Sequence, residues 1–385
     1  MYTFKGYRRP DGRVGVRNYI GVLATVSCAN PVVQQIANAV DGAVALTHSL
    51  GCTRVPEKEV HTRCLGEIGS HPNLYGCIVV SLGCESVATD KLLAMIQSTG
   101  KPTAFIRIED MGTPTAVSKG IEIALKMSQE AALLKREEFP VSELILGTEC
   151  GGSDALSGVT ANPTIGLLSD WIVENGGTSI LTEITELIGC NDILKARAKN
   201  EQVAKDINRV IEAAMDVAKD VLGGNAARAI APGNMDGGMT TIQEKALGCV
   251  RKGGSSTVNE VVDYGVRASE KGLVIMDGPG YDVESIGGMA AMGAQVIIFS
   301  TGRGNVVGFP IIPVIKVASN TDMYNIMKDN MDFNAGKLLE DGYDFEDAKK
   351  DISELFCDVA SGQQTKAELN KCGGLVCLWS WSKSL

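Results

Sequence analysis

The 385-residue sequence lacks several features that would place it in common functional classes. It contains no run of 18 apolar residues and no apolar secretory core at its N-terminus, so we expect no membrane span and a cytoplasmic protein. Its net charge of −10 leaves no basic excess to displace counterions, so we expect no nucleic-acid partner. Only three histidines occur, which argues against a mechanism that needs several imidazoles.

Motifs for familiar cofactors are also missing. There is no CxxC pair, which leaves zinc-ribbon and thioredoxin interpretations without support. The GRG triplet around Arg303 is too short for a dinucleotide fingerprint, and no P-loop lysine motif occurs. The chain does contain 11 cysteines. In a long chain without a secretory signal, these favour reduced thiols or metal ligands over disulfides.

Apolar, β-branched runs alternate along the chain with longer amphipathic segments. This alternation is typical of βαβ units and predicts an α/β fold of mainly parallel, Rossmann-like sheets with flanking helices, in two α/β halves. A charged segment ending in Phe-Pro separates an N-terminal α/β domain, residues 1–140, from a C-terminal α/β domain, residues 141–385. Strands are expected at residues 19–26, 43–48, 77–82, 103–108, 143–147, 178–183, 273–276, 295–300 and 314–318.

Thiols recur just beyond the predicted strands. The tetrapeptide SLGC closes an apolar run twice, at Cys52 and at Cys84, and two other runs end at Cys28 and Cys150. Ligands of parallel sheets bind outside the carboxyl ends of the strands, so we expect these thiols and His48 to converge at one edge. They would bind iron or zinc, or three thiolates would hold an iron–sulfur cluster. The competing interpretation is that each cysteine is a small buried apolar residue.

Polar clusters after other strands supply further candidates. Glu183 and Glu186 would share one helix face and either bind a metal or provide a general base, and a solvated helix start is the alternative. The segment TECGGSDALSGVTANPTIG presents backbone N–H groups suited to an anion, or simply caps a helix with Ser153 or Asp154. The candidates for binding an acidic substrate are Arg17, Asn18, Ser153, Asp154, Asn162, Thr301, Arg303 and Lys316.

Several long motifs resemble those of one enzyme family. GYRRPDGRVGVRN, VSCAN, THSLGC, SLGCE, TECGGSDALSGVTANPTIG, GGTSILTEITELIG, GNMDGGMTTIQEKALG and FSTGRGNVVG are similar to the large catalytic module of altronate/galactarate dehydratases. That family also contains the beta subunit of (2R)-sulfolactate sulfo-lyase. Two features depart from the family pattern, namely the LWSWSKSL ending and Cys190 after the Glu-x-x-Glu segment. Both leave the substrate open.

The resemblance implies an iron-dependent β-elimination on a 2-hydroxy acid. A sugar acid such as altronate or galactarate would lose water and become a 2-keto-3-deoxy acid. Within the same family the alternative is a sulfo-lyase large subunit that releases sulfite and pyruvate from sulfolactate. The resemblance also implies a small β-rich partner subunit, and we expect a homo-oligomer. A metal- or anion-binding regulatory subunit is the non-enzymatic alternative.

We assign roles on this basis. Fe²⁺ is the expected cofactor, and the alternative is a [4Fe–4S] cluster held by Cys28, Cys84 and Cys150. The base that removes the proton next to the carboxylate would be Glu186, Lys245 or His48. The candidate metal ligands are Cys28, His48, Cys52, Cys84, Cys150 and, as an outside candidate, Glu183.

Overall fold

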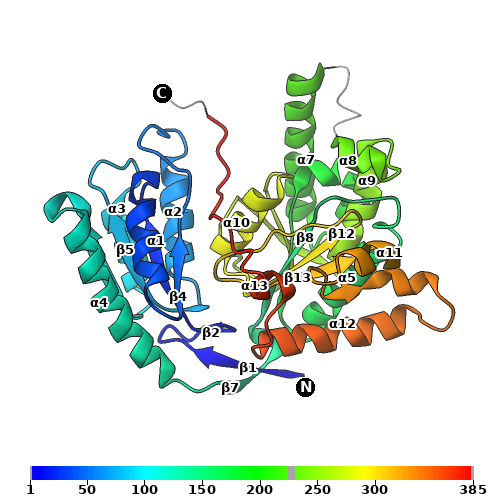
Figure 1. Ribbon diagram of the computed structural model, residues 1–385. Helices are drawn as coiled ribbons and strands as arrows, with labels where there is room; N and C mark the ends of the chain where they lie inside the picture. Colours follow the sequence, from blue (N-terminus) through cyan, green and yellow to red (C-terminus); the bar gives the residue numbers. More distant parts are fainter. Residues whose placement is uncertain (1, 224–229, 383–385) are drawn as a thin grey trace.

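The computed structural model describes residues 2–223 and 230–382 (Figure 1). Its described residues form one four-stranded and one seven-stranded parallel sheet, together with a small antiparallel sheet. Helices flank both parallel sheets, which confirms the predicted α/β class. In Figure 1 the smaller parallel sheet and its helices, blue to cyan, stand beside the larger sheet and its helices, green to orange.

The four-stranded sheet has the order β4-β3-β5-β6, and every neighbouring pair is parallel. Helices cover both faces, so the strands read as continuous apolar runs. Residues of α1 and α4 pack on one face, and residues of α2 and α3 pack on the other. The elements are β3 (Tyr19–Ala24), α1 (Asn30–Asn38), β4 (Ala43–Leu46), α2 (Lys58–Gly69), β5 (Leu74–Ser81), α3 (Thr89–Gln97), β6 (Thr103–Arg107) and α4 (Thr113–Ala132).

The seven-stranded sheet has the order β10-β11-β9-β8-β12-β13-β14 and is also parallel throughout. Its strands are β8 (Ile145–Cys150), β9 (Thr178–Leu181), β10 (Val258–Val262), β11 (Gly272–Met276), β12 (Val296–Thr301), β13 (Val314–Ala318) and β14 (Phe333–Asn334). Helices α5 (Ala161–Glu174) and α12 (Phe345–Ala360) pack with one face. Helix α10 (Asp282–Met292) packs with the other face and also contacts α2, so one apolar core joins the two halves.

The antiparallel sheet connects the N-terminus to the segment between the parallel sheets. Strand β1 (Thr3–Arg8) pairs with β2 (Val14–Gly15) and with β7 (Glu137–Pro140). The sequence does not predict these strands, because β2 is too short for a visible alternation and β7 is a charged Glu-Glu-Phe-Pro segment. All nine predicted strands are present, and β10 and β14 at the edges of the large sheet are additional.

The C-terminal segment returns to the N-terminal half of the chain, and Figure 1 shows it in red beside α2 and α10. The backbone N–H of Val376 donates to the Thr47 carbonyl at 2.8 Å. The Trp379 ring meets the edge of Tyr264, and the Trp381 N–H donates to Glu57 at 2.9 Å. None of the described helices combines the length and apolarity that a membrane crossing requires.

Candidate active site

The carboxyl ends of the strands in the large sheet carry buried polar atoms that have no hydrogen-bond partner among the described residues. Five strands that are neighbours in the sheet, β11, β9, β8, β12 and β13, lead to this edge. An unpaired buried polar group costs about 1–3 kcal/mol, so several at one edge indicate a ligand that supplies the missing partners. These atoms are Glu149 Oε1, Ser153 Oγ, Thr182 Oγ1, Glu183 Oε1, Thr301 Oγ1 and Lys316 Nζ.

Three carboxylates meet at this edge. Glu149, Glu183 and Asp282 each offer one oxygen, and these oxygens all lie within 4.8 Å of one another. Burial, and next the charge of Glu183, raise the pKa of Glu149 well above its ordinary value. Burial likewise raises the pKa of Glu183 to about 7. A divalent cation among these oxygens would remove their repulsion, and carboxylate ligands suit Fe²⁺, Mn²⁺ or Mg²⁺.

The backbone is built to bring these carboxylates together. Glu183 is the second residue after β9 and has a φ of 62°, a left-handed conformation that is rare for residues other than glycine. Such strain gathers at functional sites, where the surrounding structure enforces it. Gly151 has no side chain, and a Cβ there would lie 2.1 Å from Asp282 Oδ2. A glycine after β8 is therefore required for Asp282 to approach the sheet edge.

A thiol pair lies next to the carboxylates. Cys150 Sγ and Cys249 Sγ are 3.4 Å apart, and they lie 3.0 Å and 2.9 Å from Glu186 Oε2. All three side chains are buried, and their ligand atoms lie within 4.8 Å of one another. The Lys252 ammonium contacts Cys150 Sγ at 3.0 Å and forms a buried ion pair with Glu183. This second donor set, two sulfurs and one oxygen, suits a softer ion than the three carboxylates do.

The electrostatics separate the candidate bases. Burial opposes ionisation of Glu186, but the charges of Lys245 and Lys252 outweigh it and lower its pKa, which makes this carboxylate a weak base. Burial also opposes the charge of Lys245, yet Glu186 outweighs it and raises the Lys245 pKa, so this amine stays protonated. Burial lowers the pKa of Lys316 to about 7. Of these three groups, only Lys316 can exchange a proton near neutral pH.

The predicted substrate-binding residues of the large sheet lie along the same edge. Ser153 and Thr301 are buried and keep a free hydroxyl, as described above. The Asp154 carboxylate is engaged with the protein, since Oδ1 accepts from Ser157 and from Ser319, both at 2.8 Å. Asn162 is likewise engaged with the protein, since it accepts a hydrogen bond from Ser300. The Arg303 guanidinium is more accessible: its side chain is 44% exposed and lies 3.8 Å from Asp236.

The structure divides the predicted metal ligands between two sheets. Cys28, Cys52 and Cys84 are exposed thiols beyond the strands of the four-stranded sheet, whereas Cys150 is buried at the end of β8. His48 belongs to the smaller sheet and has no free ring nitrogen: Nε2 lies 2.8 Å from the Ala24 carbonyl, and Nδ1 accepts from the Leu50 N–H at 3.1 Å. Burial lowers the pKa of His48 to about 4.

Two corrections follow from this division. The predicted cluster ligands Cys28, Cys84 and Cys150 lie at the ends of strands in two different sheets, whereas the prediction placed them at one sheet edge. His48 is committed to positioning backbone, which removes it from the metal ligands and from the candidate bases. The alternation of strands and helices locates the strand ends but does not say which strands share a sheet.

Arg17 and Asn18 are also committed to structural contacts. All five N–H groups of Arg17 are used, by Glu368 and by the carbonyls of Val16, Val359 and Gln363. Asn18 donates to the Ala131 carbonyl and accepts from Arg9. Arg17 therefore has no free donor for the predicted contact with substrate. The sequence could not reveal this, because only the fold brings Glu368 of α13 (Lys366–Leu369) to Arg17.

The sequence prediction did not include four residues of this site: Glu149, Cys249, Lys252 and Asp282. Glu149 immediately precedes Cys150 at a strand end, and Asp282 follows the predicted strand at 273–276, so both carried the signal used for Glu183. Cys249 and Lys252 had no such signal. Cys249 closes α9 (Ile242–Cys249), one turn after Lys245, and the helix carries both to Glu186.

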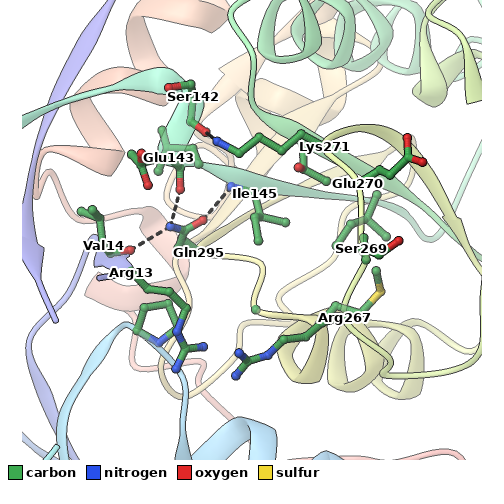
Figure 2. A pocket seen from close by; sticks show the side chains of 17 residues that line it. Arg13, Val14, Ser142, Glu143, Ile145, Arg267, Ser269, Glu270, Lys271 and Gln295 are labelled. Atoms are coloured by element: carbon green, nitrogen blue, oxygen red, sulfur yellow. Dashed lines mark hydrogen bonds between the residues drawn. The ribbon is translucent and has the colours of Figure 1, made fainter. Parts of the chain in front are cut away.

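A separate pocket of about 320 Å³ lies at the opposite end of the large sheet (Figure 2). Its lining includes Ile145 and Thr178, at the starts of β8 and β9. Figure 2 shows Gln295 bridging this wall, where it donates to the carbonyls of Val14 and Glu143. None of the lining residues belongs to the carboxylate or thiol groups. Parallel sheets bind ligands at their carboxyl ends, so this pocket is not the candidate active site.

Comparison with known proteins finds matches along nearly the whole chain. Two family models match, "D-galactarate dehydratase/Altronate hydrolase, second domain" over residues 6–132 and "D-galactarate/Altronate dehydratase, C-terminal" over residues 141–382. The chain is 34% identical to the altronate dehydratase of Bacillus subtilis, covering 96% of this chain and 76% of that protein. It is 34% identical to the galactarate dehydratase (L-threo-forming) of Escherichia coli, with 94% and 73% covered. It is 35% identical to the (2R)-sulfolactate sulfo-lyase subunit beta of Chromohalobacter salexigens, with 95% and 94% covered.

Proposed function

Because this chain belongs to the D-galactarate/altronate dehydratase family and is a lyase, we propose that it dehydrates a sugar acid such as altronate or galactarate. The observation that carries this proposal is the row of buried, partnerless polar atoms across neighbouring strand ends of the large sheet. A sugar acid is a chain of hydroxyl groups with a carboxylate, and it would satisfy those donors and acceptors together.

The proposed reaction is a β-elimination. Lys316, as the neutral amine, would take the proton from C2, next to the carboxylate, and the C–H electron pair would form the C2–C3 double bond. The C3–O bond would break, and the leaving hydroxide would become water by taking up a proton from the solvent. Lys316 would later release the proton it had gained to the solvent. The enol that remains would convert to the 2-keto-3-deoxy acid. Lys245 stays protonated, and Arg303 is partly exposed, so both suit the binding of negative groups on the substrate.

We propose ferrous iron as the cofactor and the carboxylates of Glu149, Glu183 and Asp282 as its protein ligands. Two of these residues keep a buried oxygen that has no partner among the described residues, and the three residues each offer an oxygen within 4.8 Å of the others, which fits a divalent ion. When bound, the ion would supply Lewis-acid stabilisation of the negative charge that develops on the carboxylate oxygens as the C2 proton leaves. The combination of a lysine base with a metal that stabilises an ene-diolate is known from the enolase superfamily.

Sulfolactate is the second candidate substrate. One relative is a sulfolactate sulfo-lyase subunit, and its 35% identity matches that of the dehydratases. The same proton would leave C2, but the C3–S bond would break and release sulfite, with pyruvate as the oxo acid. That relative is called subunit beta, which supports a partner subunit for this chain. We further propose that the partner is a small β-rich subunit and that the enzyme is a homo-oligomer.

The test is an anaerobic assay of the purified chain with ferrous iron, with and without a candidate small subunit. Altronate, galactarate and sulfolactate are supplied separately, and formation of 2-oxo acid and release of sulfite are measured. A 2-oxo acid from a sugar acid without sulfite supports the dehydratase proposal. Formation of sulfite and pyruvate from sulfolactate supports the sulfo-lyase proposal instead. No turnover of any substrate, in a protein that binds iron and is joined by its partner, contradicts both.

A further inference from the structure

The three exposed thiols of the four-stranded sheet form a second group, separate from the carboxylates of the large sheet. Cys28, Cys52 and Cys84 lie in the loops that follow β3, β4 and β5, which are neighbours in the order β4-β3-β5. The carboxyl ends of parallel neighbours reach the same edge, so the three loops lie side by side. We call these residues the thiol triad.

Every pair of these loops is joined by a hydrogen bond close to the cysteines. Next to Cys28, the Ser27 N–H donates to the Leu50 carbonyl at 2.8 Å, in the loop that carries Cys52. Next to Cys52, the Gly51 carbonyl accepts from Ser86 Oγ at 3.3 Å, in the loop that carries Cys84.

The third pair of loops is joined through Glu85, the residue after Cys84. Its Oε1 accepts from Thr25 Oγ1 at 2.9 Å, in the loop that carries Cys28, and its Oε2 accepts from the Gly83 N–H at 2.9 Å. The two ring nitrogens of His48 similarly join the end of β3 to Leu50. The triad is thus held on three mutually tied loops, which is the preorganisation that a metal centre needs.

The spacing of the sulfurs indicates what they would hold. Desolvation is the main cause that raises the pKa of Cys84, and the charges of Cys52, Glu85 and Cys28 add to it, so the three sulfurs are electrostatic neighbours. Among the described residues, however, the triad does not form a group whose ligand atoms all lie within 4.8 Å of one another, unlike Cys150, Glu186 and Cys249. At least one pair of its sulfurs is therefore further apart than the roughly 4 Å between thiolates that share one tetrahedral zinc ion at about 2.3 Å.

We propose that the thiol triad binds an iron–sulfur cluster of the [4Fe–4S] type, with three irons held by Cys28, Cys52 and Cys84. The irons of such a cluster occupy separate corners, so its thiolates stand further apart than those on a single ion. Three protein thiolates leave one iron open to a small oxygen ligand. This site differs from the carboxylate site in its sheet, its donor atoms and its exposure, and the inference does not depend on the proposed reaction.

The test is anaerobic reconstitution of the full chain with ferric iron, sulfide and dithiothreitol, followed by desalting. We expect about four iron and four acid-labile sulfide per chain, with a broad absorption near roughly 400 nm. Cys28→Ser, Cys52→Ser and Cys84→Ser should each lose most of the sulfide and the absorption while circular dichroism stays unchanged, because exposed thiols contribute little to the core. Cys357→Ser, in the half-buried position of α12, is the matched control and should keep both.

Asp282→Asn separates this inference from the proposed function, because it should keep the sulfide and the absorption and lose ferrous-dependent turnover. Three results would overturn the inference. They are a reconstituted chain without acid-labile sulfide, full sulfide in the three serine variants, or a single zinc ion that those variants release.

Discussion

Lys316 Nζ lies 3.5 Å from the centroid of the Phe299 ring, and no described residue accepts a hydrogen bond from it. The ring face favours the charged amine, whereas burial favours the neutral one. Burial dominates and lowers the pKa of Lys316 to about 7. Asp282 and Glu149 are close enough to oppose this shift in part, which places the amine beside the proposed metal ligands.

The first prediction concerns the pH dependence of turnover. A base acts in its deprotonated form, so kcat/KM should rise about tenfold per pH unit below about pH 7 and level off above it. Lys316→Arg keeps the charge but cannot release its proton, and kcat should fall by about 10²–10⁴-fold. Lys349→Arg, at a partly exposed pair with Glu174, is the control. A flat profile between pH 6 and 8, or full turnover by Lys316→Arg, would remove Lys316 as the base.

The second prediction concerns the carboxylate site. Asp282→Asn removes one anionic ligand, so the affinity for Fe²⁺ or for Mn²⁺ as a stable probe should fall by at least about tenfold, the loss that is typical even for outer-shell partners of metal ligands. Calorimetric titration of the metal-free chain measures this directly. Asp263→Asn, which changes an exposed aspartate after β10, should bind as the parent does. Equal affinities for both variants would contradict the assignment of Asp282.

The third prediction concerns Arg17 and Glu368, whose guanidinium and carboxylate are 2.7 Å apart and nearly buried. Arg17→Lys has fewer donors and loses the bidentate geometry, so the free energy of unfolding should fall by about 3 kcal/mol. The KM for substrate should stay unchanged. Lys91→Ala, in an exposed pair with Glu59, should cost less than about 1 kcal/mol. Denaturant titration measures the free energy of unfolding of both variants. A raised KM with unchanged stability in Arg17→Lys would instead support a role of Arg17 in substrate binding.

The fourth prediction concerns acid stability. Burial lowers the folded-state pKa of His48 to about 4, below the ordinary 6.5, so the unfolded chain takes up its proton first as the pH falls. Stability is therefore fully present above pH 6.5 and is lost between pH 6.5 and about 4, by up to about 3 kcal/mol for this group. Thermal melts across that range should show a shallower acid loss in His48→Gln. Parallel slopes for the two proteins would contradict the assignment.

The sequence by itself determined the strand ends, because burial on both faces of a parallel sheet requires continuous apolar runs that any reader can see. It therefore located Glu183, Ser153, Thr301 and Lys316, each of which lies within or just after such a run. The same local pattern marked Cys28, Cys52, Cys84 and Cys150 as a set, since each thiol follows a run. The family membership likewise followed from motifs whose order along the chain needs no coordinates.

Only the tertiary structure decided which strand ends meet. The pairing of β8 with β9 and β12 moved Cys150 away from the other thiols and toward Cys249, which is 99 residues further along the chain. The approach of Asp282 depends on the bare backbone at Gly151, and the ionisation of Lys316 depends on its burial. The separation of Arg17 from the site depends on a distant helix. These properties arise from contacts between remote segments and from the water those contacts exclude, and neither is encoded in the local alternation of apolar and polar residues.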